Sequence, residues 1–288
     1  MLLNKIEAVR EEVGKYKKEG FKIGLVPTMG ALHEGHLSLI RRARKECDRV
    51  VVSVFVNPIQ FGPSEDFDKY PRTLEADTSL CEKEGVDIVF APAPSEMYGE
   101  GNRLSNDTLT YVCPPFFYVN KLCGKSRVGH FDGVCTVVNK LFNIVQPDVA
   151  FFGQKDAQQV IIIKKMVKDL NIPIEIIQCP IVREESGLAL SSRNKYLSEE
   201  DKKEALVLSR ILNNIKICYN KGVTDVSALK ETAYSFLTEK HDIEYLELMD
   251  RNTLEEKSTA DNNTIALIAC RVEGVRLIDN IYLGDSNA

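Results

Sequence analysis

Two of the four histidines in this 288-residue chain stand three positions apart, as His33 and His36, with Gly35 between them. They follow a short apolar run, 21–26, and precede a segment with helical spacing. At the carboxyl end of a strand that faces a helix N-terminus, free amides and the helix dipole favour a phosphate. Two imidazoles there suit stabilising the charge that develops on a phosphate during reaction. A capped helix with two incidental histidines is the plain alternative, and a zinc site is a weaker third reading because no third ligand lies nearby.

Two familiar phosphate-binding motifs do not explain this segment. The spacing from Gly30 to Gly35 imitates a P-loop, but His36 stands where the phosphate-binding lysine should be. The dinucleotide pattern Gly-x-Gly-x-x-Gly is absent, and Gly124-Lys125-Ser126 lacks the upstream glycine because position 119 is valine. We therefore interpret His33–His36 as a phosphate site of another kind.

A second segment, Gly153-Gln154-Lys155-Asp156, has the same context, since it follows the apolar run 149–152 and opens a predicted helix. Gly153 allows close backbone contact, Lys155 supplies a mobile charge, and Asp156 can cap the helix or serve a ribose or a metal. Ordinary helix capping is the alternative for Lys155 and Asp156.

Further along, Ser191-Ser192-Arg193 combines two hydroxyls with a guanidinium group. This combination suits the β- and γ-phosphates of a nucleotide. A polar loop between domains is the alternative interpretation.

The spacing of apolar residues predicts the elements that position these segments. A helix is expected at 4–19. The strand at 21–26, the helix at 36–46 and the strand at 50–56 that follow it form a βαβ unit, which requires a parallel sheet. Helices and strands continue to alternate, at about 72–84, 87–90, 133–145, 149–152, 156–170 and 174–178, with a long loop at 91–110. We expect a doubly wound, Rossmann-like α/β domain over residues 1–181.

The pattern changes in the last third of the chain. Ser198-Glu199-Glu200-Asp201 is a capping box that opens a long helix, and a second helix is expected at about 225–239. Three short strands follow, at 243–249, 264–270 and 274–283. Residues 182–288 are therefore predicted to form a smaller C-terminal α+β domain, which could close as a lid.

Composition narrows the function classes. With 37 Lys+Arg, 42 Asp+Glu and a net charge of −5, the chain is unsuited to non-specific binding of nucleic acid. The N-terminus becomes charged too soon for a signal peptide, and the longest aliphatic run, Val160–Ile163, is too short to span a membrane. We expect a soluble, cytoplasmic protein with eight reduced cysteines, since no Cys-x-x-Cys pair occurs.

The segment Val26–His36 resembles the signature of the pantothenate synthetase (pantoate–β-alanine ligase) family, within the His-x-Gly-His nucleotidyltransferase superfamily. Five further segments resemble the family's motifs in the same order: Phe55–Phe61, Tyr70–Leu74, Gly129–Val134, Phe152–Gln159 and Gly187–Asn194. The resemblance covers roughly residues 20–200 and is looser beyond them.

The resemblance implies a Mg²⁺-dependent, homodimeric ligase that joins pantoate to β-alanine. ATP would be cleaved to AMP and pyrophosphate through a pantoyl-adenylate. The catalytic residues implied are His36 as proton donor, His33 beside it on the phosphates, and Lys155. The ATP-binding residues implied are Met29, Gly30, Ala31, Leu32, His33, Glu34, Gly35, His36, Gly153, Gln154, Lys155, Asp156, Val182, Leu190, Ser191, Ser192 and Arg193. Gln60 and Gln159 would bind pantoate, Val182 would contact adenine through its backbone, and Arg127 would lie near pyrophosphate.

One motif departs from the family pattern. Where the family usually shows Leu-Glu-Gly-x-x-Arg, this chain has Leu122-Cys123-Gly124-Lys125-Ser126-Arg127. Cys123 could be a reactive thiol, because the neighbouring cations would lower its pKa. Two other functions stay open: a His-x-Gly-His enzyme that transfers a nucleotide to a phosphorylated acceptor, and a catalytically silent ATP-binding sensor.

Overall fold

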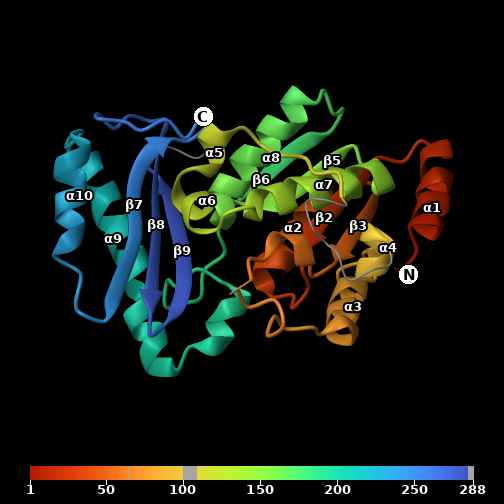
Figure 1. Ribbon diagram of the computed structural model, residues 1–288, viewed down its shortest axis with the longest axis horizontal. Coiled ribbons are helices and arrows are strands. Elements are labelled where there is room, and N and C mark those ends of the chain that lie inside the picture. Colours follow the sequence, from red (N-terminus) through yellow and green to blue (C-terminus); the bar gives the residue numbers. More distant parts are fainter. Residues whose placement is uncertain (64, 100–108, 285–288) are drawn as a thin grey trace. The chain divides into compact units, whose positions relative to one another are not determined.

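The computed structural model describes residues 1–63, 65–99 and 109–284, so the middle of the predicted loop at 91–110 lies outside the described residues. The chain forms two compact units (Figure 1). The first unit contains Met1–Gly153 and Ile162–Pro180, and the second contains Gln154–Ile161 and Ile181–Ala288. The segment 154–161, which the sequence places in the first domain, is thus grouped with the second unit.

A six-stranded sheet forms the centre of the first unit. Its strands are β1 (Leu2–Leu3), β2 (Ile23–Thr28), β3 (Arg49–Val54), β4 (Ile88–Phe90), β5 (Val149–Gly153) and β6 (Glu175–Cys179). Their order is β1-β4-β3-β2-β5-β6, and every neighbouring pair is parallel. Because β2 has β3 on one side and β5 on the other, the direction of winding reverses at β2 and β5. The predicted doubly wound fold is confirmed.

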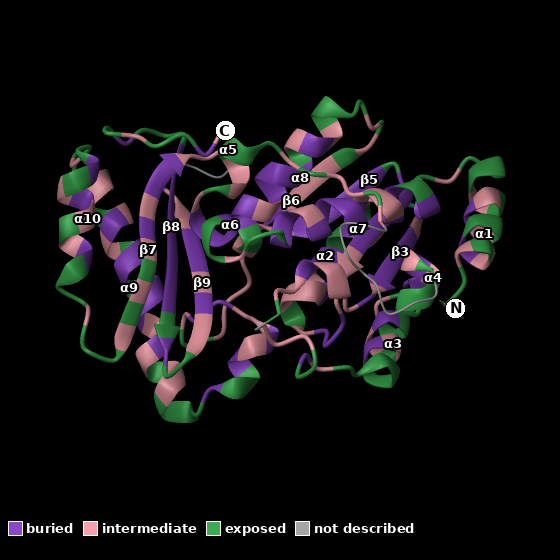
Figure 2. Ribbon diagram, in the orientation of Figure 1, coloured by how far each residue is buried: buried purple, intermediate pink, exposed green. Residues whose placement is uncertain are grey.

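The helices of this unit cover a sheet whose central strands are buried (Figure 2). They are α1 (Ile6–Lys18), α2 (Glu34–Glu46), α3 (Leu74–Lys83), α4 (Pro94–Tyr98), α5 (Phe116–Val119), α6 (Leu122–Ser126), α7 (His130–Val145) and α8 (Ala157–Asp169), the last of which continues from the second unit. Val50–Val52 in β3 are fully buried, and each such valine contributes about 1.5 kcal/mol or more of hydrophobic stabilisation. The sequence did not predict β1 or the short helices α4, α5 and α6, because elements this short contain too few residues to show a periodic pattern.

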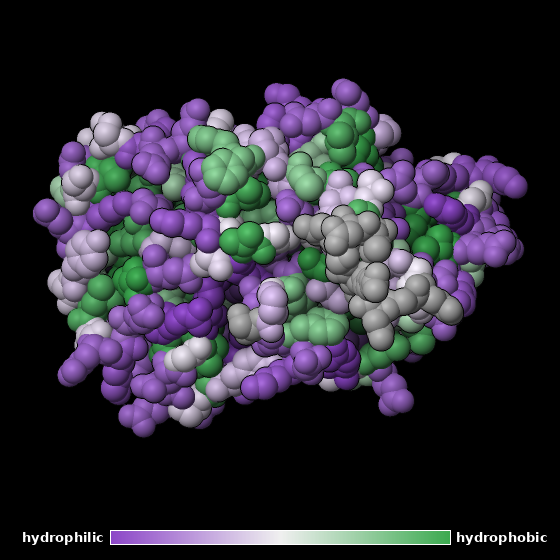
Figure 3. Space-filling view, in the orientation of Figure 1, coloured by the Kyte–Doolittle hydropathy of each residue, from purple (hydrophilic) through white to green (hydrophobic). Residues whose placement is uncertain are grey.

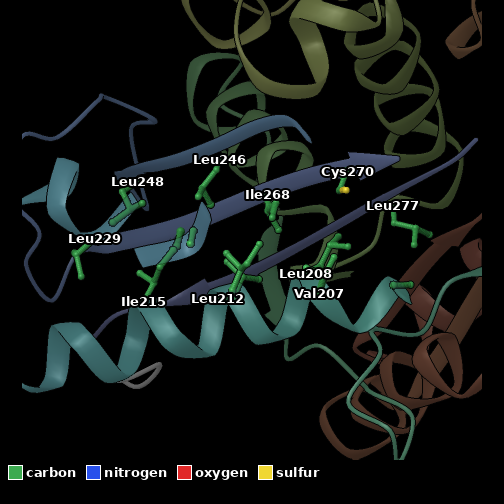
Figure 4. Close-up of a cluster of buried hydrophobic side chains, with 14 of the residues drawn as sticks. Val207, Leu208, Leu212, Ile215, Leu229, Leu246, Leu248, Ile268, Cys270 and Leu277 are labelled. Carbon is green, nitrogen blue, oxygen red and sulfur yellow. The ribbon is translucent and has the colours of Figure 1, made fainter. Parts of the chain in front are cut away.

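The second unit packs two helices, α9 (Glu199–Asn220) and α10 (Val226–Tyr234), against a three-stranded antiparallel sheet. The strands are β7 (His241–Asp250), β8 (Thr264–Val272) and β9 (Val275–Tyr282), paired in that order. Leu208, Leu212 and Ile215 of α9 form part of its hydrophobic core (Figure 4). The capping box is present, since the amide of Asp201 donates to Ser198 Oγ over 3.1 Å. A C-terminal α+β arrangement is confirmed.

Polar residues cover most of the face shown in Figure 3, with hydrophobic residues gathered in a few places. The exposed apolar side chains of the first unit include Phe116, Phe117 and Val128. In the described part of the chain, no helix has both the length and the apolar character needed to cross a membrane.

Candidate functional site

The carboxyl ends of β2 and β5 mark the candidate site in the first unit, because ligands of open α/β sheets bind where the winding reverses. β2 runs through Pro27 to Thr28, two residues beyond its predicted end. Thr28 is held to the neighbouring strand, since its hydroxyl donates to the Ser53 carbonyl over 2.7 Å. The chain then enters the loop 29–33, which leads directly into α2.

Glycine is required at the first bend of this loop. Gly30 has a φ of +83°, and its amide donates to Thr28 Oγ1 over 3.1 Å. A Cβ at this position would lie 3.0 Å from both Asp77 Oδ2 and Val54 Cγ1. The loop is therefore folded tightly against α3 and β3.

Asp77, on α3, holds the next two residues of the loop. Its carboxylate accepts the amide of Ala31 over 3.0 Å and the amide of Leu32 over 2.8 Å. Ala31 has a φ of +50°, so these bonds stabilise a left-handed conformation that a non-glycine residue rarely adopts. Asp77 is only 1% exposed. Sequence reasoning missed this residue, although a carboxylate four positions before the buried Cys81 on one helix was a usable signal.

His33 and His36 lie together at the start of α2, with their ring centroids 4.1 Å apart. The amide of Gly35 donates to His33 Nδ1 over 3.1 Å, and the amide of His33 donates to His36 Nδ1 over 3.3 Å. Because each Nδ1 accepts a hydrogen bond, each neutral ring carries its proton on Nε2. The N-terminus of α2 thus presents two N–H donors from imidazoles as well as its own dipole.

Gln60, at the end of the 3-10 turn Pro58–Gln60, is 7% exposed, and its side-chain amide is oriented by two neighbours. Asn57 Nδ2 donates to Gln60 Oε1 over 3.0 Å, and Gln60 Nε2 donates to Met29 Sδ over 3.1 Å. Asn57 is held in turn by the hydroxyl of Tyr98, at 2.7 Å. The structure therefore brings the predicted pantoate residue Gln60 against the predicted ATP-binding loop.

Arg127 forms a bidentate ion pair with Glu65, at 2.7 and 2.6 Å. Burial alone would raise the pKa of Glu65, but the hydrogen bonds and charge of Arg127 hold that pKa below its usual 4.5. Arg127 also donates to His130 Nε2 over 3.0 Å, and His130 Nδ1 donates to the Gln60 carbonyl over 2.8 Å. Arg127 is thus linked through His130 to Gln60.

In the second unit, β9 holds the segment that carries Lys155. Gln154–Asp156 form a 3-10 turn, and Asn280 Nδ2 donates to the carbonyls of Gln154 and Lys155, at 3.0 Å each. The predicted residue Gln159 follows on the first turn of α8 and is half-buried.

The remaining predicted residues of this unit lie in a hairpin and the turn after it. The amide of Leu190 donates to the Val182 carbonyl over 3.0 Å, which closes the hairpin. Ser191 then caps the 3-10 turn Ser192–Tyr196, because its hydroxyl accepts the amide of Arg193 over 3.3 Å. Val182, Leu190 and Ser191–Arg193 are therefore parts of one local structure.

The reactive-thiol interpretation of Cys123 is not supported. The side chain is buried, with 8% of the residue exposed, whereas attack on a reagent requires access to the thiol. All eight cysteines are described, and they are thiols that form no disulfide bond. Among the described residues, no three His, Cys, Asp or Glu side chains group closely enough to hold a metal ion.

Comparisons with known proteins show the family to which the chain belongs. The family model described as pantoate-β-alanine ligase matches residues 1–282. A pantothenate synthetase from Clostridium novyi is 55% identical over 280 residues, which cover 96% of each chain. The crystal structure of the pantothenate synthetase from Thermus thermophilus superposes with a TM-score of 0.91 at 42% identity, covering 99% of both chains. Pantoate-β-alanine ligase from Francisella tularensis, complexed with beta-gamma ATP and β-alanine, has a TM-score of 0.76 at 37% identity, covering 98% of this chain and 97% of the other. This chain therefore belongs to the pantoate–β-alanine ligase family of enzymes.

Proposed function

We propose that this enzyme joins pantoate to β-alanine using ATP, through a pantoyl-adenylate, and releases AMP and pyrophosphate. The observation that carries the proposal is the position of His33 and His36 at the N-terminus of α2, beside the winding reversal of the sheet, with a backbone amide donating to Nδ1 of each ring. The Francisella relative complexed with beta-gamma ATP and β-alanine supports the choice of substrates.

In the first step, a carboxylate oxygen of pantoate attacks the α-phosphorus of ATP. The bond between the α-phosphorus and the bridging oxygen breaks, and pyrophosphate leaves with the electron pair. Negative charge grows on the phosphate oxygens, so His33, His36, Lys155 and the N-terminus of α2 stabilise the transition state. His36 is the proposed proton donor.

In the second step, the amine of β-alanine attacks the acyl carbon of the adenylate. The amide C–N bond forms, AMP leaves as a phosphate anion, and the nitrogen loses a proton. Gln60 and Gln159 are the proposed pantoate residues. The Gln60 amide suits this role because Asn57 and Met29 fix its orientation, while Nε2 retains a second N–H for a ligand.

The other proposed ATP residues of the first unit are Met29–Gly35 and Gly153. In the second unit, the proposed ATP residues of the 3-10 turn after β5 are Gln154 and Asp156. Those of the hairpin and of the turn that follows it are Val182, Leu190, Ser191, Ser192 and Arg193. Arg127 is the proposed pyrophosphate contact. The lid role of the second unit and a cytoplasmic location stay predictions from the sequence, and the homodimer stays a prediction from the resemblance.

A Mg²⁺ ion would reach this site with ATP. Magnesium ions at nucleotide sites usually take most of their oxygen ligands from phosphates and water, and one or two from carboxylates. Asp156, which is exposed in the 3-10 turn just before α8, is the residue that would help to hold the ion. When bound, the ion would neutralise part of the negative charge on the phosphates.

Isotope exchange between pyrophosphate and ATP tests the proposal. Exchange should require pantoate and proceed without β-alanine, because the adenylate forms before the amine reacts. With all three substrates, the enzyme should produce AMP and pyrophosphate. The formation of ADP and phosphate, or exchange that is independent of pantoate, would show the proposed reaction to be wrong.

Two variants test the residue roles in the same assay. His36→Ala and Lys155→Ala should each slow pantoate-dependent exchange by about 10²-fold or more, as losing a transition-state donor does elsewhere. Lys165→Ala is the matched control, because Lys165 lies on α8 and pairs with Asp169 at the surface. Near-normal exchange in a folded His36→Ala or Lys155→Ala protein would remove that residue from the mechanism.

A further inference from the structure

Two neighbouring residues of β9, Asp279 and Asn280, contact the two segments of the second unit for which ATP binding is proposed. Both are buried, with 4% and 2% of the residue exposed. Consecutive residues of a strand point to opposite faces of a sheet, so the two side chains can hold two different segments. No motif of the sequence indicates a role for either residue.

Asn280 holds the backbone around Lys155. Its Nδ2 donates to the carbonyls of Gln154 and Lys155, at 3.0 Å each, and its Oδ1 accepts Gln154 Nε2 over 3.1 Å. Both N–H groups and the oxygen of the buried amide are therefore used on this one turn. A turn of three residues has few backbone hydrogen bonds of its own, so its conformation depends on such outside partners.

Asp279 holds the hairpin that carries Val182 and Leu190. Its two carboxylate oxygens accept the guanidinium of Arg183 at 2.7 and 2.9 Å, a bidentate pair. Arg183 also donates to the Gly187 carbonyl over 3.1 Å, across the turn of the hairpin. A bidentate pair restricts orientation as well as distance. Asp279 therefore fixes the direction of the hairpin relative to β9.

We propose that Asp279 and Asn280 are positioning residues for the adenylation step: Asn280 sets the backbone from which Lys155 reaches the phosphates, and Asp279 sets the hairpin that contacts the adenosine. This inference rests on the proposed function. Asn280 acts through the turn that carries Lys155, and Asp279 acts through the hairpin. Substitutions at these neighbouring positions should therefore change different kinetic constants.

The signatures follow from what each segment does. Asn280→Ala should lower kcat for pantoate-dependent exchange by about 10-fold, because small misplacements of a catalytic group are costly. The KM for pantoate should stay within about twofold, and Asn280→Ser, which keeps one hydrogen-bonding group, should recover part of the rate. Asp279→Asn should instead raise the KM and the Kd for ATP by about 10-fold and leave kcat within about threefold.

A double-mutant cycle separates positioning from a general loss of stability. If Asn280 acts through Lys155, then Asn280→Ala should slow exchange by less than about twofold in a Lys155→Ala protein. Leu277→Ala is the matched control, because Leu277 lies on the same strand in the core of the second unit. It should lower the thermal midpoint measured by circular dichroism without changing kcat or the KM for ATP.

Each outcome bears on the inference. An equal effect of Asn280→Ala in the presence and absence of Lys155, or unchanged constants in folded Asn280→Ala and Asp279→Asn proteins, would overturn it. If the unmodified enzyme showed no pantoate-dependent exchange, the proposed function would fail, but calorimetric titration of ATP into the same variants would still test the positioning of the hairpin. Unchanged ATP affinity in Asp279→Asn would then refute that part.

Discussion

Replacing Asp77 should loosen the loop that carries the candidate phosphate site, although Asp77 lies on a different helix. Its buried carboxylate accepts the amides of Ala31 and Leu32, and both of these residues are themselves buried. In Asp77→Ala, neither amide keeps an acceptor. The loop would then lose two bonds that stabilise the conformation in which Ala31 has a φ of +50°.

The size of the effect follows from these two bonds. A buried amide without a partner costs about 1–3 kcal/mol, so two of them give about 2–6 kcal/mol. Removing a buried carboxylate returns part of its desolvation cost, which leaves an expected loss of about 2–3 kcal/mol in the free energy of unfolding. Asp77→Asn keeps one acceptor and should lose about half as much. If the bound conformation of the loop becomes tenfold less populated, which about 1.4 kcal/mol achieves, the KM for ATP rises about tenfold.

Urea unfolding followed by circular dichroism measures the stability, and pantoate-dependent exchange measures the KM for ATP. Ser79→Ala is the control, because Ser79 is exposed on the same helix and its replacement should change stability by less than about 0.5 kcal/mol. A loss below about 1 kcal/mol in Asp77→Ala, together with an unchanged KM for ATP, would refute the reasoning.

Three further predictions concern the first unit. Gly133→Ala should raise the KM for pantoate, because a Cβ there would lie 2.6 Å from the Cα of Gln60. Gly14→Ala is the control and should leave that KM unchanged, because its Cβ would meet nothing within 4 Å. Equal KM values in the two variants would contradict the prediction. The lowered pKa of Glu65 makes its stabilisation present above its usual pKa of 4.5 and lost as pH falls through the folded-state value. Glu65→Gln should therefore be less stable than the parent at pH 7, by a difference that shrinks on acidification; a constant difference in unfolding titrations would argue against the ion pair. Iodoacetamide should modify the exposed Cys113 before the buried Cys123, as peptide mass mapping would show, and faster labelling of Cys123 would restore the reactive-thiol interpretation.

Local sequence was sufficient for the main features of both units. The valine run at 50–52 predicts a strand buried on both faces, and the alternation of such runs with helical spacing requires a parallel sheet. Two histidines at a strand-to-helix junction then place the candidate site at the carboxyl edge of that sheet. The fold inferences succeeded because periodicity and capping depend on residues close together in the chain, whereas the site stays a prediction.

The tertiary structure alone decided which residues hold the site in place. Asp77 stands 46 residues from Ala31, and Asn280 stands 125 residues from Lys155, so no local pattern connects either pair. The sequence assigned 154–161 to the first domain, whereas in the structure this segment is bonded to Asn280 and groups with the second unit. The physical reason is that buried backbone groups need partners, and folding supplies those partners from whichever distant strand or helix lies alongside.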